Sequence, residues 1–453
     1  MSSNRLRTLW ASPPRALRAQ WTWIAIVAGL ALAVRVPLFF VRAELFPGGD
    51  SRLYLTLAQG IPRGEFEGMF RTPGYPAFLW LVGLLPGRTE DAAVIVQHLL
   101  GVGLAAGLVT LGWRLFSPAA GVLAGAIAAL SRVFVGLEDL ILADFLFGLV
   151  AFAGAAALAI AAAARRDNYV MFVLAGVLFG LAAYVKPVGQ ALILAAPVAF
   201  ALSSRDLRRT LLATGLVVAA MVVTVTPWVV RNEIAFDDAR MSNQLGITLF
   251  NRAFEVERLP VPLDDPQGPV ASELTAAAFA EPGLRPSSYV HTELSHRGFS
   301  SDEALEIERR LATTAIKREP WQYLGTSGTR IADGIEDLDE AELPDRLGEA
   351  PAVLRHPSEA LLRVSGTLSS LWFLASAHLL VALVLLFVPG PSRPAAAAFI
   401  GVALLILIAT VLTHGGMPRY SLQVAPETWL VGSAGLIYVI GAVASRIRGE
   451  PKS

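Results

Sequence analysis

Ten long apolar stretches constrain this chain more than any other feature of its sequence. A helix needs about 20 apolar residues to cross roughly 30 Å of hydrocarbon, because backbone polar groups cannot stay unpaired there. The stretches come near that length, and a hydrophobic content of 54% exceeds what a soluble core would bury. We therefore predict an all-α polytopic membrane protein with about ten transmembrane helices. The stretches are, approximately, 22–41, 92–113, 119–135, 140–164, 169–185, 188–202, 210–228, 369–388, 395–413 and 425–444.

The charge and cysteine content exclude several classes of function. Lys and Arg number 37 and Asp and Glu number 37, so the formal net charge is zero and no global field recruits nucleic acid. The absence of cysteine excludes disulfides, thiolate nucleophiles and Cys-ligated zinc. The first apolar stretch, Trp21 to Val41, is long enough to span and no Ala-x-Ala site follows it. We expect a retained helix rather than a cleaved signal.

If the number of spans is ten, all of the basic residues that flank the apolar stretches lie on the same side of the membrane. By the positive-inside bias that side is cytoplasmic, which places both termini inside the cell and the protein in the cytoplasmic membrane. The loop after the first helix, the turns near 138–144 and 186, and the long segment after 228 then face outward. The basic residues are Arg5, Arg7, Arg15, Arg18, Arg165, Arg166, Arg205, Arg208, Arg209, Arg446, Arg448 and Lys452.

Three parts of the chain follow from this pattern. Residues 1–228 form an N-terminal transmembrane module of about seven helices, whose first external loop is 42–91. Residues 229–365 form one extracytoplasmic insertion, and residues 366–453 form a C-terminal transmembrane module of about three helices with a cytoplasmic tail. The loop 42–91 also has the pattern of short amphipathic helices.

The insertion has one clear helix and one acidic run. Ser300 to Glu303 forms a capping box, and the helix after it, with Leu305 and Leu311 on one face, ends near Pro320. The acidic run 333–345 lacks the ligand spacing of a calcium loop, so a solvated charged face is favoured over a cation site.

Short motifs in the outward-facing segments resemble a known superfamily. The first loop contains a Gly-Gly-Asp sequence, FPGGDSRLYLTLAQGI, and then RTPGYPAFLWLVGLLPG. An acidic turn LEDLILADF, a lysine turn AYVKPVG, an exit TPWVVRN and a late MPRYSLQVAPE follow in order. Together they resemble the GT-C membrane glycosyltransferases of the family 39 type, which include protein O-mannosyltransferases and lipid A aminoarabinose transferases. Five motifs in order, all on one side, are more specific than any one alone.

The resemblance implies a GT-C-type helical bundle and an inverting glycosyltransferase of the extracytoplasmic side. Sugar nucleotides are cytoplasmic, so an enzyme on the outer face needs a donor delivered through the membrane, and a sugar on a polyprenyl phosphate fits. The implied partners are this donor, membrane lipids and a lipid, glycan or protein acceptor, without nucleic acid.

Transfer from such a donor requires a base for the acceptor hydroxyl, positive charge for the departing phosphate and a groove for the isoprenoid chain. By the resemblance, Asp50 is the general base, and attack opposite the phosphate inverts configuration. The alternative is that Asp50 is only the N-cap of the helix containing Tyr54. Asp144 supports the active site by the same resemblance, or is one half of a structural ion pair with Lys186 or an arginine.

Four cations are candidates for the donor phosphate. Lys186 ends an apolar helix, where it binds the lipid phosphate or simply extends to the headgroups. Arg71, Arg231 and Arg419 can each bind phosphate through a bidentate fork, or can anchor the chain at the interface. Tyr420 follows Arg419 and is a candidate contact of the carrier.

The remaining candidates would line the acceptor side of the site. They are Tyr54, Tyr75, Glu138, Asp139 and His414. The alternative for the tyrosines is an interfacial aromatic belt. No cofactor and no set of metal ligands are predicted, although the carboxylates could hold a divalent cation.

Two other functions stay open at this point. A transporter or flippase of lipid-linked sugar would have paired broken helices and charges near the bilayer midplane, with related halves. The sequence shows no convincing inverted repeat, and its charges concentrate at one interface. A scaffold or receptor would use the polar turn residues as anchors, which does not explain the convergence of five motifs on one side.

Overall fold

The computed structural model describes residues 14–43, 45, 49–66, 68–164, 167–204, 206–325, 347–369, 381–388, 390, 392–414 and 422–447. In this part of the chain the secondary structure consists of helices joined by turns and loops, without a strand. Six described helical segments are long and apolar enough to cross a membrane, and a bent pair makes a seventh. The prediction of an all-α polytopic membrane protein is confirmed. The six are α1 (Pro14–Arg35) continued by η2 (Val36–Phe40), α4 (Thr89–Leu115), α7 (Ala143–Ala163), α10 (Leu207–Phe236), α20 (Ser392–His414) and η8 (Leu422–Val424) continued by α22 (Ala425–Ile447).

The other predicted spans are bent or short. One is a helix pair that bends by 61° between its halves, and two are shorter apolar helices. The predicted span 369–388 lies mostly outside the described residues, so the number ten stays a prediction. These elements are α5 (Pro118–Leu130), α6 (Arg132–Glu138), α8 (Tyr169–Val185), η4 (Pro187–Leu194) and α9 (Ala195–Ser203).

Glycines allow the spanning helices to approach closely. A Cβ on Gly121 of α5 would lie 2.5 Å from the carbonyl oxygen of Val109 on α4. A Cβ on Gly180 of α8 would lie 2.6 Å from Cβ of Thr224 on α10. Such close contacts stabilise helix pairs in lipid, because lipid tails are as apolar as the helices and association there depends on packing rather than on the hydrophobic effect.

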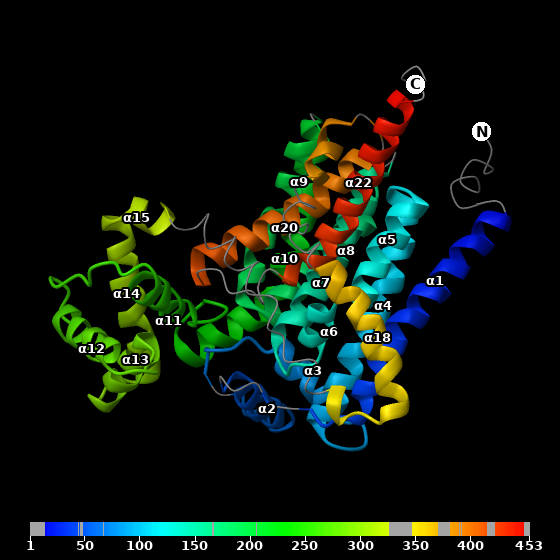
Figure 1. Cartoon of the computed structure of the whole chain (residues 1–453). Helices are drawn as coiled ribbons and strands as arrows, with labels where there is room; N and C mark the ends of the chain where they lie inside the picture. Colours follow the sequence, from blue (N-terminus) through cyan, green and yellow to red (C-terminus); the bar gives the residue numbers. More distant parts are fainter. Residues whose placement is uncertain are drawn as a thin grey trace.

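The bundle has two chemically different ends. At the arginine end, Arg209 of α10 donates to the carbonyls of Ala161 and Ala164 at 3.0 and 2.8 Å, and Arg393 of α20 donates to that of Leu202 at 3.3 Å. At the loop end lie α2 (Asp50–Gly60), η3 (Ile61–Arg63) and α3 (Gly74–Val82). Figure 1 shows α2 and α3 opposite the first turn of α1 and the last turn of α22. The predicted short helices of the first loop are confirmed.

The insertion after α10 forms a helical unit beside the loop end (Figure 1). It has a core of its own around Phe250, Phe254, Leu294 and Leu311. The predicted capping box is present at the start of its longest helix. The acidic run 333–345 lies outside the described residues. The helices of this external unit are α11 (Leu245–Phe250), η5 (Asn251–Val256), α12 (Gly268–Ala280), α13 (Pro286–His296), α14 (Ser301–Arg318) and α15 (Pro320–Gly325).

A further helix, α18 (Ala352–Ser369), runs along α1 and returns the chain to the bundle. The hydroxyl of Ser358 donates to the carbonyl of Ala33 at 2.8 Å. The predicted boundary at residue 365 therefore falls inside a helix.

Candidate active site

A cavity of about 1030 Å³ opens at the loop end, where the bundle, the first external loop and the external unit meet. Four of the predicted ionic residues line it, namely Asp50, Arg71, Asp144 and Lys186. Tyr54 and His414 line it as well. The fold thus brings side chains from separate segments of the chain into one space.

Asp50 and Arg71 form an ion pair inside this cavity. Gly49, with a φ of 82°, turns the chain into α2, and Asp50 follows as the first helical residue. The N-cap is Gly49 and has no side-chain cap, so the interpretation of Asp50 as an N-cap is wrong. Arg71 Nη2 donates to Asp50 Oδ1 at 2.6 Å, and its guanidinium lies 5.3 Å from the ring of Tyr54. The Asp50 side chain keeps 27% of its surface exposed, enough to meet a substrate.

Asp144 and Lys186 form the second ion pair. Lys186 Nζ donates to Asp144 Oδ1 at 2.9 Å, which confirms the predicted pairing. Asp144 lies in the first turn of α7, where the helix dipole favours a carboxylate. Lys186 lies where α8 ends and the backbone becomes extended before Pro187. Gln423 Nε2 also donates to Asp144 Oδ1, at 2.6 Å.

Sequence reasoning did not single out Gln423. Its backbone carbonyl approaches α7 so closely that a Cβ on Gly148 would lie 2.7 Å from it. Gln423 belongs to the MPRYSLQVAPE motif, which was the signal available in the sequence. Arg419 and Tyr420 of the same motif lie outside the described residues.

Tyr75 lies behind the cavity rather than in its lining. Its ring meets Tyr54 edge to face at 4.9 Å, and its hydroxyl donates to Gln97 Oε1 at 3.0 Å. Burial raises the pKa of the Tyr75 hydroxyl well above its ordinary value, so the group stays protonated and serves as a donor.

Glu138 and Asp139 also lie outside the lining, in a buried ionic cluster. Arg35 donates from Nε and Nη2 to the two carboxylate oxygens of Glu138, at 2.7 and 2.6 Å. His98 lies 2.8 Å from Glu138 and 3.4 Å from Asp139. Arg35 and Glu138 side chains are both fully buried, so each charge depends on its partner.

This cluster fixes the acidic turn that leads into Asp144. The break between α5 and α6 frees backbone carbonyls, and Arg35 donates to those of Ala128 and Ala129 at 3.3 and 3.0 Å. Gln97 Nε2 donates to the carbonyls of Glu138 and Leu140 at 2.6 and 3.0 Å. The expected site-lining role of the acidic pair is thus replaced by a supporting position.

Ser51 connects the same turn to the first external loop. Its hydroxyl donates to the carbonyl of Ile141 at 3.0 Å. Asp50 precedes Ser51 and Asp144 follows Ile141 by three residues, so this bond holds the two acidic segments together.

Arg231 does not line the cavity. Its guanidinium donates to the carbonyls of Phe66 and Gly68 and lies 4.7 Å from the ring of Trp228. It therefore fastens the first external loop to α10. His414, the last residue of α20, does line the cavity, and its Nδ1 lies 2.6 Å from Thr413 Oγ1.

Among the residues that the structure describes, no group of three or more His, Asp or Glu side chains could hold a metal ion. Arg71 and Lys186 are the predicted cations that line the cavity and could contact a phosphate.

Comparisons with known proteins support the fold. Residues 71–230 match the family described as dolichyl-phosphate-mannose-protein mannosyltransferase. The oligosaccharyltransferase AglB of Archaeoglobus fulgidus, solved with an inhibitory peptide and a dolichol-phosphate, superposes with a TM-score of 0.53 at 13% identity. That match covers 97% of this chain and 53% of the archaeal protein. The apo form of the same enzyme gives a TM-score of 0.50 at 12% identity, over 96% of this chain and 52% of that one.

A second enzyme is more distant in structure. ArnT from Cupriavidus metallidurans bound to undecaprenyl phosphate gives a TM-score of 0.40 at 15% identity, over 94% of this chain and 79% of that one. A search of curated proteins finds no match. The chain spans about half the length of the archaeal enzyme, and the superposition with it confirms the predicted GT-C-type bundle.

Proposed function

We propose that this polytopic membrane protein, whose bundle has the GT-C fold, is an inverting glycosyltransferase that moves a sugar from a polyprenyl-phosphate carrier to an acceptor hydroxyl. One observation carries the proposal: two ion pairs from four separate segments converge on one cavity that also has an apolar wall. The acceptor is a lipid, a glycan or a protein.

Similarity to known proteins supports the donor class. The matched family is named for a dolichyl-phosphate mannose donor, and the segment it matches includes Arg71, Asp144 and Lys186. The archaeal structure of the same fold holds a dolichol-phosphate. A polyprenyl phosphate is therefore the donor carrier that we assign to this chain.

The apolar wall suits the isoprenoid tail. It is formed by one stripe of α10 that contains Met221, Val225 and Val229 at helical spacing, together with Val222. Val222 keeps 46% of its surface exposed, and its neighbour Val223 keeps 71%, so the wall continues onto the lipid-facing side of the helix. A carrier tail lying on this stripe would bring its phosphate toward Lys186.

The ionic residues suit the transfer step. The acceptor oxygen attacks the anomeric carbon from the face opposite the phosphate, the bond from that carbon to the phosphate oxygen breaks, and Asp50 takes the hydroxyl proton. Polyprenyl phosphate leaves with its negative charge held by Arg71 and Lys186. Asp144 and Gln423 position the lysine, and Tyr54 and His414 contact the sugar or the acceptor.

Arg71 has two tasks in this scheme. It keeps the Asp50 carboxylate in place before the donor binds. When the donor phosphate arrives, the guanidinium shifts part of its hydrogen bonding to the phosphate, and the carboxylate becomes available for the proton.

A transporter of lipid-linked sugar has no support from the known proteins that match, and the cavity's charged groups lie at one end of the bundle. The decisive experiment is transfer of radiolabelled sugar from polyprenyl phosphate donors in membranes that contain the protein. Asp50→Asn should lower turnover by about 10²- to 10⁴-fold, the usual contribution of a general base. Asp237→Asn removes the same charge from an exposed position outside the cavity and should leave turnover unchanged. Unchanged turnover in the Asp50 variant would remove the assigned base.

We further propose that the loop end faces outward and the arginine end the cytoplasm, so that both termini are cytoplasmic. The clustering of Arg209 and Arg393 at one end supports this orientation. The natural chain has no cysteine, so single cysteines report sidedness cleanly. In intact cells an impermeant maleimide should label Glu65→Cys and not Leu207→Cys; the reverse pattern would invert the topology.

A further inference from the structure

The cavity has a second wall, which comes from the external unit and the segment leading into it. Five polar residues define this polar wall: Arg240, Gln244, Asn251, Arg285 and Ser288. None of them belongs to a motif that sequence analysis singled out, and none has a task in the transfer step.

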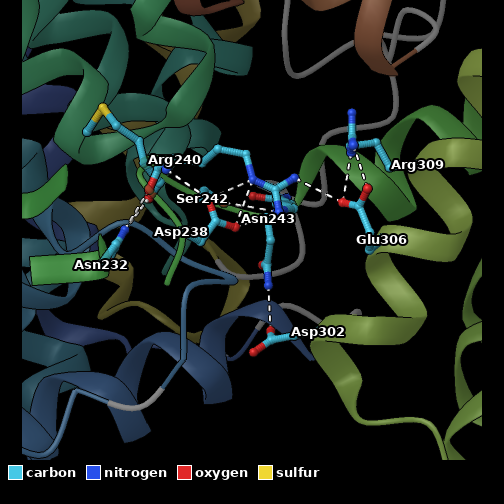
Figure 2. A network of polar contacts seen from close by, with 10 residues as sticks. Asn232, Asp238, Arg240, Ser242, Asn243, Asp302, Glu306 and Arg309 are labelled. Carbon is cyan, nitrogen blue, oxygen red and sulfur yellow. Dashed lines mark hydrogen bonds and ion pairs between the residues drawn. The ribbon is translucent and has the colours of Figure 1, made fainter. Parts of the chain in front are cut away.

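The arginine at one side of the polar wall is part of a compact ionic network (Figure 2). Arg240 Nε lies 2.9 and 2.8 Å from the two carboxylate oxygens of Asp238, and Nη1 lies 3.3 Å from Glu306. Arg309 Nε donates to Glu306 at 2.9 Å. Two guanidinium groups therefore face two carboxylates, and the network has no net charge.

The other arginine is paired more loosely. Arg285 Nε lies 3.6 Å from one oxygen of Glu255, and the hydroxyl of Ser287 donates to the other oxygen at 3.0 Å. The Arg285 side chain keeps 61% of its surface exposed, so it also has donors left for a ligand. A wall built from such pairs attracts neither an anion nor a cation strongly.

Three side chains of the wall have hydrogen-bonding capacity left. Among the described residues, the amides of Gln244 and Asn251 and the hydroxyl of Ser288 make no side-chain hydrogen bond. Asn251 begins the π-helical turn η5, an irregular helical geometry that is frequent at functional sites. Amide and hydroxyl groups donate and accept, which is also the chemistry of a sugar hydroxyl.

The polar wall is fastened to the loop that carries Arg71. Ser242 Oγ donates to the carbonyl of Phe70 at 2.9 Å. The backbone amide of Asn243 donates to the backbone carbonyl of Met69 at 3.2 Å. The side chain of Asn243 donates to Asp302 at 2.6 Å (Figure 2). These bonds therefore fix the position of the wall segment relative to the loop that carries Arg71.

We propose that the polar wall is an acceptor subsite for carbohydrate, so that the acceptor hydroxyl belongs to a glycan or to the sugar headgroup of a lipid. This inference rests on the proposed function and specifies its acceptor. Guanidinium groups beside free amides and a hydroxyl present donors and acceptors next to each other, which suits the vicinal hydroxyls of a sugar. The pairing of both arginines with carboxylates argues against a phosphorylated headgroup.

Binding in the absence of donor tests the subsite directly. Saturation-transfer NMR is measured on the full-length protein in lipid nanodiscs, with a panel of neutral methyl glycosides and disaccharides and with a serine- and threonine-containing hexapeptide as the second arm. The double variant Gln244→Ala/Asn251→Ala should weaken binding of the sugars at least about tenfold, as expected from the loss of two neutral hydrogen bonds. Ser288→Ala should weaken it less. Thr292→Ala, an exposed change on the same helix as Ser288, is the matched control and should bind as the wild type does.

Binding of polyprenyl phosphate to the same samples separates the two proposals. Carrier binding should be unchanged in the wall variants, which would show that these variants are folded. It should be weakened at least about tenfold by Lys186→Met. Retained carrier binding with sugar binding lost only in the wall variants supports the subsite. Absence of sugar binding to the wild type, equal sugar binding by the wall variants, or binding of the peptide alone would overturn it. If the wild-type protein does not bind polyprenyl phosphate, the proposed function itself is overturned.

Discussion

Gly101 offers a test in which the sign of the stability change decides between two physical accounts. It lies on α4 facing the buried cluster, where an added Cβ would lie 2.5 Å from Cδ and 2.7 Å from Oε2 of Glu138. The carboxylate cannot move aside freely, because Arg35 and His98 hold it. Gly101→Ala should therefore break the bidentate pair between Arg35 and Glu138.

The magnitude follows from two opposing terms. Helix propensity alone favours alanine over glycine by about 1 kcal/mol. Breaking a buried ion pair costs about 3–5 kcal/mol, so the net effect is a destabilisation of about 2–4 kcal/mol. Gly103, two positions further along the same helix, has nothing within 4 Å of an added Cβ. Gly103→Ala is the matched control and should be neutral or slightly stabilising.

The assay is the apparent melting temperature of each purified variant in one detergent, together with transferase activity. The Gly101 variant should melt several degrees below the wild type and lose activity, since the displaced cluster no longer fixes the turn before Asp144. An equal gain of stability in both variants would show that Glu138 moves without cost and would refute the account of the cluster.

Three further predictions concern the donor site and the external unit. Lys186→Met should weaken binding of polyprenyl phosphate at least about tenfold, because a charge-assisted hydrogen bond to the phosphate is lost; unchanged affinity in a nanodisc titration would exclude the phosphate contact. The pKa values of Asp238 and Glu306 are lowered mainly by hydrogen bonds from their arginine partners. These two ionised carboxylates therefore contribute fully to stability above about pH 4–5, and the contribution is lost as the pH falls through the lowered pKa values. Limited proteolysis of the external unit should accelerate as the pH falls from about 5 to about 3, the range in which carboxyl groups take up protons, and a flat profile would contradict the assignment. The pKa of His291 is raised mainly by its contact with the Glu308 carboxylate, whose oxygen lies 3.5 Å from Nδ1. That pair therefore stabilises the unit below the unfolded pKa of about 6.5, and the gain is lost as the pH rises through the higher folded value; histidine NMR should show the raised pKa fall back in Glu308→Gln.

The parts of the fold set by local pattern could be predicted from the sequence. Apolar length fixed the spans, because a membrane helix must satisfy its own backbone. The capping box at Ser300 and Glu303 was predictable, because its hydrogen bonds join residues three positions apart. The first-loop motif located Asp50, and the expense of an unpaired carboxylate in the membrane predicted a partner for Asp144.

Apart from the pairing of Asp144 with Lys186, the contacts between distant segments described above could not be predicted. Glu138 was expected in the cavity lining, but its partner Arg35 lies 103 positions earlier and draws it into the bundle. The bond of Gln423 to Asp144 joins residues 279 positions apart, which no local period reveals. Such contacts depend on how the helices pack, which the sequence pattern of one helix does not contain.

Arg231 is an intermediate case. It was expected at the phosphate, yet it stacks on Trp228, three positions earlier on the same helix face. The spacing of three was visible in TPWVVRN and indicates neighbouring side chains on a helix. A cation with an aromatic neighbour at this spacing already contacts that ring, which makes it less available to a ligand.

The lipid-facing continuation of the α10 stripe has a kinetic consequence. A hydrophobic carrier that reaches the cavity along this stripe moves by lateral diffusion within one leaflet and never passes through the aqueous phase. Turnover should then follow the mole fraction of carrier in the bilayer and stay constant when the buffer volume around the same vesicles is doubled. For such an enzyme, the Michaelis constant of the donor is properly expressed per unit of membrane area.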